Sequence, residues 1–276
     1  MPPILLQAIL ECGVERWRHI DPPLASVLAQ NEAQGKKPGI YVLDFSDRFG
    51  RSPTVEHMHR ILDAVNRYLD TKNADSAAVK EAVRIDEVKA KLTPVEVKLA
   101  REGARRYLTI ANPKAIKTLV TTLRGHTKHL APTQRLPFVL RDVGYALDCA
   151  KRLDNHFEHT NSNLVMGLFE IVTKSDSTLC DLCMMHGNSV CLCFDLPDAA
   201  VGEITISVLA QAYVETGKGF NGVEAGRSIE SNSQPKVREW LAWQHAALCT
   251  GPFRQNVQSG KQRIAAYRTR WESLAS

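Results

Sequence analysis

The sequence has no run of about 20 consecutive apolar residues, the length that a helix needs to cross a bilayer. The apolar stretch near the N-terminus has no basic region before it and no small-residue cleavage site after it, so we expect no Sec signal peptide. Internal repeats and low-complexity tracts are also missing. Because 44% of the residues are hydrophobic and 24% are charged, we expect a soluble globular protein and exclude wholesale disorder.

The chain also lacks the even, dispersed set of cysteines that a disulfide framework requires. It has seven cysteines, and four of them fall within residues 180–193. An odd number with a tight cluster is typical of thiols that bind metal or react in a reducing compartment, so we expect a cytoplasmic protein. The sequence contains neither a glycine-rich phosphate-binding loop nor a His-Glu helix motif. It therefore predicts no nucleotide-cofactor site of those kinds.

Three helix starts organise the first half of the chain. Ser52-Pro53, Thr93-Pro94 and Asn112-Pro113 each place a capping residue before a proline, which is tolerated in the first turn of a helix. Glu96 completes a capping box with Thr93, and we expect that helix to end near Thr109. Apolar residues at helical spacing predict the remaining helices. The main markers are Leu5 and Ile9; Ala82, Ile85 and Leu92; Leu136, Leu140, Val143, Leu147 and Ala150; Leu164 to Val172; Val201, Ile204 and Val208; Val237, Trp240 and Leu248; and Ile264, Tyr267 and Trp271.

The only strand-like passage is Ile40 to Phe45, and glycine and proline residues flank it. The expected fold is therefore all-α, a multi-helix globular bundle with at most a minor strand pair near residues 40–45. Residues 124–135 combine Gly, Pro, Thr and charge without periodicity, which is typical of a boundary between subdomains. We expect an N-terminal helical region with a basic face at 1–130 and a C-terminal helical region at 131–276 that carries the cysteine cluster.

Positive charge is concentrated in one segment. Between Lys98 and Arg135 there are nine Lys or Arg residues and one acid, Glu102, so the segment carries about +8. Such a field can hold the phosphates of nucleic acid or an acidic protein partner, although it also suits an ordinary solvated helix face. The segment has one aromatic residue, Tyr107, whereas single-strand binding would need several that interleave with the cations. The candidate phosphate-binding residues are Lys114, Lys117, Arg124, Lys128 and Arg135.

The cysteine cluster allows a zinc site. Thiolate and imidazole are the ligands that zinc prefers, and a Cys-x-x-Cys turn can place two sulfurs on one side. Any four of five side chains could close a tetrahedral site. These are Cys180, Cys183, His186, Cys191 and Cys193.

Two other interpretations of the cluster remain open. One cysteine could be a nucleophile, since His186, Asp181 and Asp195 are close enough in sequence to act as its base or acid. The run could also be inert, because it is rich in Leu, Met, Val and Phe, and free cysteines behave as small hydrophobic residues.

Several segments around the cluster resemble the bacterial "novel E3 ligase" effectors, over about 80 residues and in the same order. The resemblance is carried by Leu164-x-x-x-Leu168-Phe169-x-Ile171, Ser177-Thr178-x-Cys180-Asp181, Val214-Glu215-x-Gly217, Ala225-Gly226-Arg227 and Trp240-Leu241-Ala242-Trp243-Gln244. The family is all-α, is secreted into host cells and transfers ubiquitin through a thioester on a Cys-x-Asp cysteine. Here Asp181 directly follows Cys180, and the one Cys-x-Asp is Cys193-Phe194-Asp195, followed by Leu196 where the family carries arginine.

The resemblance implies an effector-type E3 ubiquitin ligase, located in a host cytoplasm, whose partner is a ubiquitin-conjugating enzyme. Cys180 or Cys193 would carry the thioester, with Asp181 or Asp195 as the matching acid, or the copy would be degenerate. The alternative is a non-enzymatic helical module, stabilised by zinc, that binds nucleic acid or an acidic protein through residues 98–135. Whether the chain is an enzyme is left open at this point.

Overall fold

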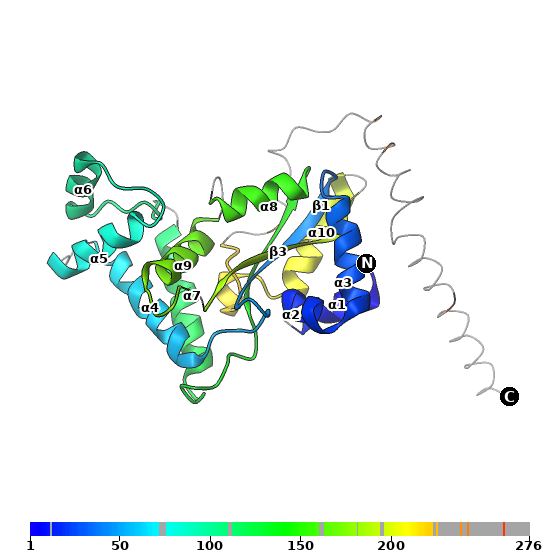
Figure 1. The fold of residues 1–276 in the computed structure, drawn as a ribbon, viewed down its shortest axis with the longest axis horizontal. Helices are drawn as coiled ribbons and strands as arrows, with labels where there is room; N and C mark the ends of the chain where they lie inside the picture. The colour runs from blue at the N-terminus through cyan, green and yellow to red at the C-terminus, as the bar shows by residue number, and fades with distance from the viewer. Residues whose placement is uncertain are drawn as a thin grey trace.

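The computed structural model describes residues 1–222 apart from 12, 72–75, 110–111, 160–162, 181 and 194–195, together with the single residues 225, 238, 242 and 262. A three-stranded antiparallel sheet lies at its centre, with helices on both faces (Figure 1). The prediction of an all-α bundle is therefore wrong. The described helices are α1 (Pro3–Leu10), α2 (Val14–Ile20), α3 (Pro22–Ala33), α4 (Val55–Leu69), α5 (Ser76–Asp86), α6 (Pro94–Arg101), α7 (Asn112–Thr127), α8 (Cys149–Phe157), α9 (Leu164–Ser175), α10 (Leu196–Leu209) and the short 3-10 helix η1 (Val214–Thr216).

The sheet has the strand order β2-β1-β3, so the strand predicted from Ile40 to Phe45 lies in its middle. This strand, β1, runs over Gly39–Ser46 and pairs with β2 (Leu140–Ala146) and β3 (Met184–Leu192). β2 forms the middle of the stretch from Leu136 to Ala150, which was predicted as a helix. Because both faces of β2 are covered and all its residues are buried, its sequence does not show the polar and apolar alternation of a half-exposed strand.

Alternate residues of β1 enter two separate hydrophobic cores. Leu43 and Phe45 belong to the first core, which includes residues of α4, α7, α8 and α9. Ile40 and Val42 belong to the second core, which includes residues of α1, α3 and α10. This follows from the period of two in an extended chain. Both cores draw residues from either side of residue 130, near which the chain was expected to divide.

The predicted helix starts at Thr93 and Asn112 are confirmed, and the capping box between Thr93 and Glu96 is present. α4 begins at Val55 and takes Thr54 as its N-cap, two residues later than the start expected at Ser52. α6 ends at Arg101, well before Thr109. Gly103 has φ of 98°, and the N–H of Ala104 donates to the carbonyl of Leu99 at 2.9 Å, which closes the helix in a Schellman motif.

Among the described residues, no helix is long and apolar enough to cross a membrane. The two helices predicted after residue 236, and the similar segments at 225–227 and 240–244, lie outside the described residues apart from single positions.

Candidate functional site

The cysteine cluster is not a loop, because most of it forms β3. Cys180 precedes the strand in the turn that follows α9, where it is half-buried and its thiol donates to the carbonyl of Ser177 at 3.4 Å. Cys183 is buried in the first core, whereas Cys191 and Cys193 pack in the second core. The sheet therefore separates Cys183 from the last two cysteines.

The five candidate zinc ligands do not meet. His186 lies opposite Asp44 on β1, and Cys191 lies opposite Ile40. Because these two partners are four residues apart on β1, the two candidate ligands lie about 13 Å apart along the sheet. Ligands of one zinc ion each lie about 2.0–2.3 Å from the metal. Within the described parts of the chain, no group of three or more His, Cys, Asp or Glu side chains could hold a metal ion.

The two candidate nucleophiles differ in their surroundings. Cys193 is 4% exposed, and a hydrogen bond with the Cys191 thiol, together with burial, raises the pKa of its own thiol. A buried thiol with a raised pKa is a poor nucleophile. Cys180 is half-buried and is the better placed of the two. Their expected acids, Asp181 and Asp195, lie outside the described residues.

His186 faces α2 and belongs to a row of polar side chains that crosses the sheet. Arg141, Asp44 and His186 are neighbours on β2, β1 and β3. Glu15 of α2 lies above the row, with its Oε1 3.8 Å from Nδ1 of His186 and its Oε2 accepting from the Asn188 amide at 3.1 Å. These contacts fix α2 on the sheet, and so they place the residues that α2 exposes.

The basic segment also divides in the structure. Arg124 forms an exposed ion pair with Asp63, while Arg135 donates to the Ser52 carbonyl and has Nη1 3.4 Å from Oδ2 of Asp47. Lys114 and Lys117 lie on the exposed side of α7. They line a shallow groove of about 480 Å³ with Pro113, Thr118, Thr121 and Thr122, which we call the α7 groove.

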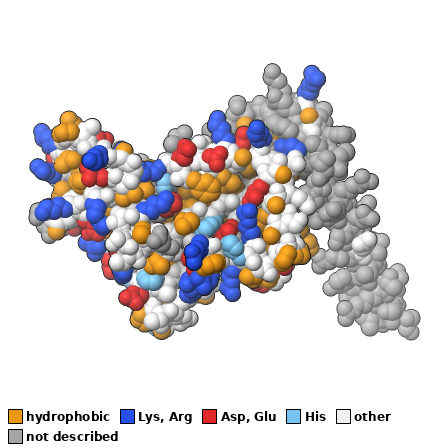
Figure 2. All heavy atoms as spheres, viewed as in Figure 1, with side chains coloured by type: hydrophobic (Ala, Val, Ile, Leu, Met, Phe, Trp, Pro, Cys, Tyr) orange, Lys and Arg blue, Asp and Glu red, His pale blue; other side chains and the backbone are white. Residues whose placement is uncertain are grey.

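Arg135 lies instead in a second hollow, of about 290 Å³, that the sequence did not predict. Arg16 and Trp17 of α2 and Arg51 of the β1–α4 connection share it with Arg135, and we call it the arginine hollow. In Figure 2, Lys and Arg side chains gather in the lower middle of the molecule, where Figure 1 shows this connection beside α2. The other lining residues are Glu11, Gly13, Ile20, Gly50, Ser52, Leu136, Pro137, Phe138 and Val139.

Asp47 and Gly50 shape the connection that brings Arg51 to the hollow. Oδ1 of Asp47 accepts from the N–H groups of Phe49 and Arg51 at 2.9 Å, and its Oδ2 accepts from Nε of Arg51 at 2.8 Å. Burial raises the pKa of Asp47, but these hydrogen bonds outweigh it and lower the pKa below its usual value. Gly50 has φ of 71°, and a Cβ there would lie 2.1 Å from the backbone nitrogen of Arg16, so only glycine fits.

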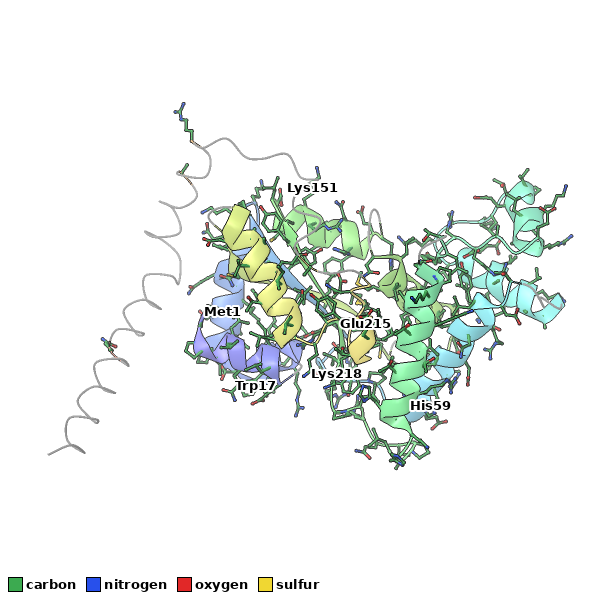
Figure 3. All side chains as sticks on the ribbon, turned by 180° about the vertical axis from the view of Figure 1, so that it is seen from behind. Met1, Trp17, His59, Lys151, Glu215 and Lys218 are labelled. Carbon is green, nitrogen blue, oxygen red and sulfur yellow. The ribbon has the colours of Figure 1, made fainter. Side chains whose placement is uncertain are left out.

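The Phe138 ring connects the arginine hollow with α7. It lines the hollow, and its centroid lies 5.7 Å from that of the His126 ring on α7 and 5.4 Å from Nζ of Lys218. Figure 3 shows Trp17 on α2, and in this view Lys218 lies between α2 and α7. Gly217, which precedes Lys218, packs closely against Thr122 of the α7 groove. We call the hollow, Lys218 and the α7 groove together the basic strip. Its cations are Arg16, Arg51, Arg135, Lys218, Lys117 and Lys114.

The basic segment did not predict Arg16, Trp17 and Arg51, because they lie outside it. The signal was present in Arg48-Phe49-Gly50-Arg51, a basic and aromatic turn directly after the strand. Comparisons of the chain with models of protein families, with curated proteins and with solved structures found no match. The resemblance to the ligase effectors thus remains a prediction.

Proposed function

We propose that this protein is a binding module for single-stranded nucleic acid, with the arginine hollow as its principal contact. One observation carries the proposal: three guanidinium groups and an indole from distant parts of the sequence line the same hollow. Guanidinium groups match phosphate oxygens in pairs, and aromatic faces stack on bases of any sequence. Tyr107, the one aromatic residue of the basic segment, is buried, and α2 supplies an aromatic side chain at the hollow.

The basic strip favours an extended ligand over a single nucleotide. A small ligand would fill the arginine hollow alone, whereas a chain of phosphates can also reach Lys218 and the α7 groove. Lys114 and Lys117 are exposed, and three threonines line the groove with them. Lysine and threonine side chains both bind phosphate oxygens without reading bases. We therefore expect binding that depends weakly on sequence.

The test is the affinity of the full chain for a labelled 20-nucleotide poly-dT at low salt. Arg16→Glu should weaken binding about tenfold or more, because a charged hydrogen bond is lost and a repulsion replaces it. Arg101→Glu on α6 makes the same change of charge away from the strip, and it should leave affinity nearly unchanged. Equal losses for both variants would contradict the proposal.

An acidic protein is the competing partner, and the same assay decides between the two. Poly-glutamate of similar length carries the charge without bases or phosphates. It should compete poorly with the oligonucleotide, because carboxylates cannot stack on Trp17. If poly-glutamate displaces the oligonucleotide at equal concentration of charge, the strip is a site for acidic protein segments and the nucleic-acid proposal is wrong.

Cysteine-dependent ubiquitin transfer is the second candidate, and the partial exposure of Cys180 favours it. A nucleophile must meet its substrate, and Cys180 lies in a turn at the surface, whereas Cys193 is buried. Incubation with a ubiquitin-charged conjugating enzyme should then give a thiol-sensitive adduct that Cys180→Ala abolishes and Cys193→Ala retains. Absence of any adduct, or an adduct that survives Cys180→Ala, would exclude this candidate.

A further inference from the structure

Cys191 and Cys193 lie side by side at the end of the sheet where β3 leaves it, and Cys149 lies nearby. Cys191 lies near the end of β3, Cys193 follows the strand, and Cys149 begins α8. The thiols of Cys191 and Cys193 share a hydrogen bond, and both interact electrostatically with Cys149. A Cβ built on Gly39 would lie 3.1 Å from Sγ of Cys149 and 2.6 Å from the Cys191 carbonyl, so this glycine permits the close approach.

The backbone brings Cys191 and Cys193 to one side. Residues i and i+2 of an extended chain point to the same face, and both cysteines pack in the second core. At this spacing their Cα atoms are about 6.4–6.8 Å apart, at the upper end of the range of a disulfide. The pairing register shifts between Ile40 and Tyr41, where Val190 is the extra residue of a β-bulge. Bulges re-aim the side chains beside them.

We propose that Cys191 and Cys193 form a reversible thiol–disulfide site that is oxidised by hydrogen peroxide. The Cys191 thiolate attacks one peroxide oxygen, the O–O bond breaks, and the departing hydroxide takes up a proton to become water. The resulting sulfenic acid is attacked by the sulfur of Cys193, whose proton leaves with the sulfenic hydroxyl as a second water. Two electrons pass from the two sulfurs to peroxide, and one S–S bond is formed.

The surroundings of Cys191 and Cys193 suit them to different roles, the first reacting with peroxide and the second with the sulfenic acid. Cys191 is half-buried and therefore reachable, whereas Cys193 is buried and can react only with a neighbour. The hydrogen bond from Cys193 holds the pKa of the Cys191 thiol below its usual value, which favours the thiolate. A disulfide between residues two apart closes a small strained ring, and strained disulfides are reduced easily. The site is thus suited to reversible oxidation.

The test treats the full chain with stoichiometric hydrogen peroxide, alkylates it after unfolding and maps the peptides by mass spectrometry. We expect a loss of two hydrogen masses and two unalkylated cysteines, both in the peptide that carries Cys191 and Cys193, restored by dithiothreitol. This measurement on the unchanged protein does not depend on whether a variant folds. A disulfide that includes Cys149 or Cys180, or no loss of thiols, would overturn the proposal.

Variants then separate the two steps. Cys193→Ser should stop the reaction at the sulfenic acid, which dimedone traps on Cys191. Cys191→Ser should abolish both the trapped adduct and the disulfide. Cys180→Ser is the matched control, since Cys180 is also half-buried but lies before β3, away from Cys191 and Cys193. It should leave the disulfide unchanged. Dimedone labelling of Cys193 in the Cys191→Ser variant would contradict the division of roles.

Discussion

Arg141 and Asp44 form an ion pair that is closed to solvent, with side chains 0% and 1% exposed and Nη2 3.1 Å from Oδ1. They are cross-strand neighbours on β2 and β1. Nη1 of Arg141 donates to the Ile9 carbonyl at 2.7 Å, and Oδ2 of Asp44 accepts from the Glu15 N–H at 3.1 Å. The pair therefore ties the sheet to the end of α1 and the start of α2, the helix that carries Arg16 and Trp17 of the arginine hollow.

Removing the negative partner should strongly destabilise the fold. Asp44→Ala leaves the Arg141 guanidinium buried without its counter-ion, for which we expect a loss of about 3–5 kcal/mol in the free energy of unfolding. Denaturant unfolding measures it. Asp63→Ala is the control, because it breaks the exposed pair with Arg124 and should cost less than about 1 kcal/mol. Similar losses for the two variants would show that Arg141 is not a buried charge.

Asp142 should make stability fall as the pH rises. Desolvation is the main cause that raises the pKa of this buried carboxyl to about 6, although the Asn163 amide donates to it at 2.8 Å and opposes the shift. Between about pH 4 and pH 6 the folded protein therefore keeps a proton that the unfolded chain releases. Asp142 therefore contributes about 3 kcal/mol to the free energy of unfolding. This contribution is present in full below about pH 4 and is lost above about pH 6.

Asp142→Asn removes this titration, so its stability relative to the unchanged protein should increase between pH 4 and pH 7. Urea unfolding at several pH values measures the difference. Asp154→Asn makes the same change at an exposed carboxyl on α8 and is the control for the replacement itself. A constant difference for Asp142→Asn would mean that Asp142 is ionised in the fold without penalty.

The helix starts could be predicted because they depend on neighbouring residues. Thr93 and Glu96 satisfy each other's backbone groups whatever the rest of the chain does. β2 could not be predicted in the same way. Its apolar residues match helical spacing as well as a buried strand, and its polar residues, Arg141 and Asp142, are explained only by partners far away in sequence, Asp44 and Asn163. Periodicity does not distinguish a fully buried strand from a helix.

The candidate sites show the same limit. The clustering of Cys180, Cys183, His186, Cys191 and Cys193 in sequence predicted one zinc site, but an extended strand spreads neighbours along its length and across two faces. Arg135 was predicted as a phosphate ligand from local charge, but its companions Arg16 and Arg51 belong to other segments. Only tertiary structure brings these arginines together.

A chelator should not destabilise the protein. Since the five candidate zinc ligands do not meet at one point in the described part of the chain, no folding free energy should come from metal coordination there. EDTA should leave the melting temperature unchanged, and metal analysis should find less than stoichiometric zinc. Cys183→Ala should still lower stability, because it removes a side chain that is buried in the first core. Stoichiometric zinc whose removal lowers the melting temperature would contradict the described arrangement of β3.

The salt dependence of nucleic-acid binding should separate the two kinds of contact in the arginine hollow. Each phosphate that a cation neutralises on a single strand releases about 0.7 counterion, so Arg16→Ala should reduce the slope of log affinity against log salt by about 0.7.

Trp17→Leu keeps an apolar side chain in the second core but removes the stacking surface. It should cost about 1–3 kcal/mol of binding free energy and leave the slope unchanged, because stacking releases no counterions. Fluorescence anisotropy at four or more salt concentrations measures both quantities. An unchanged slope in Arg16→Ala would show that Arg16 does not contact phosphate, and a changed slope in Trp17→Leu would show that the indole does not act by stacking alone.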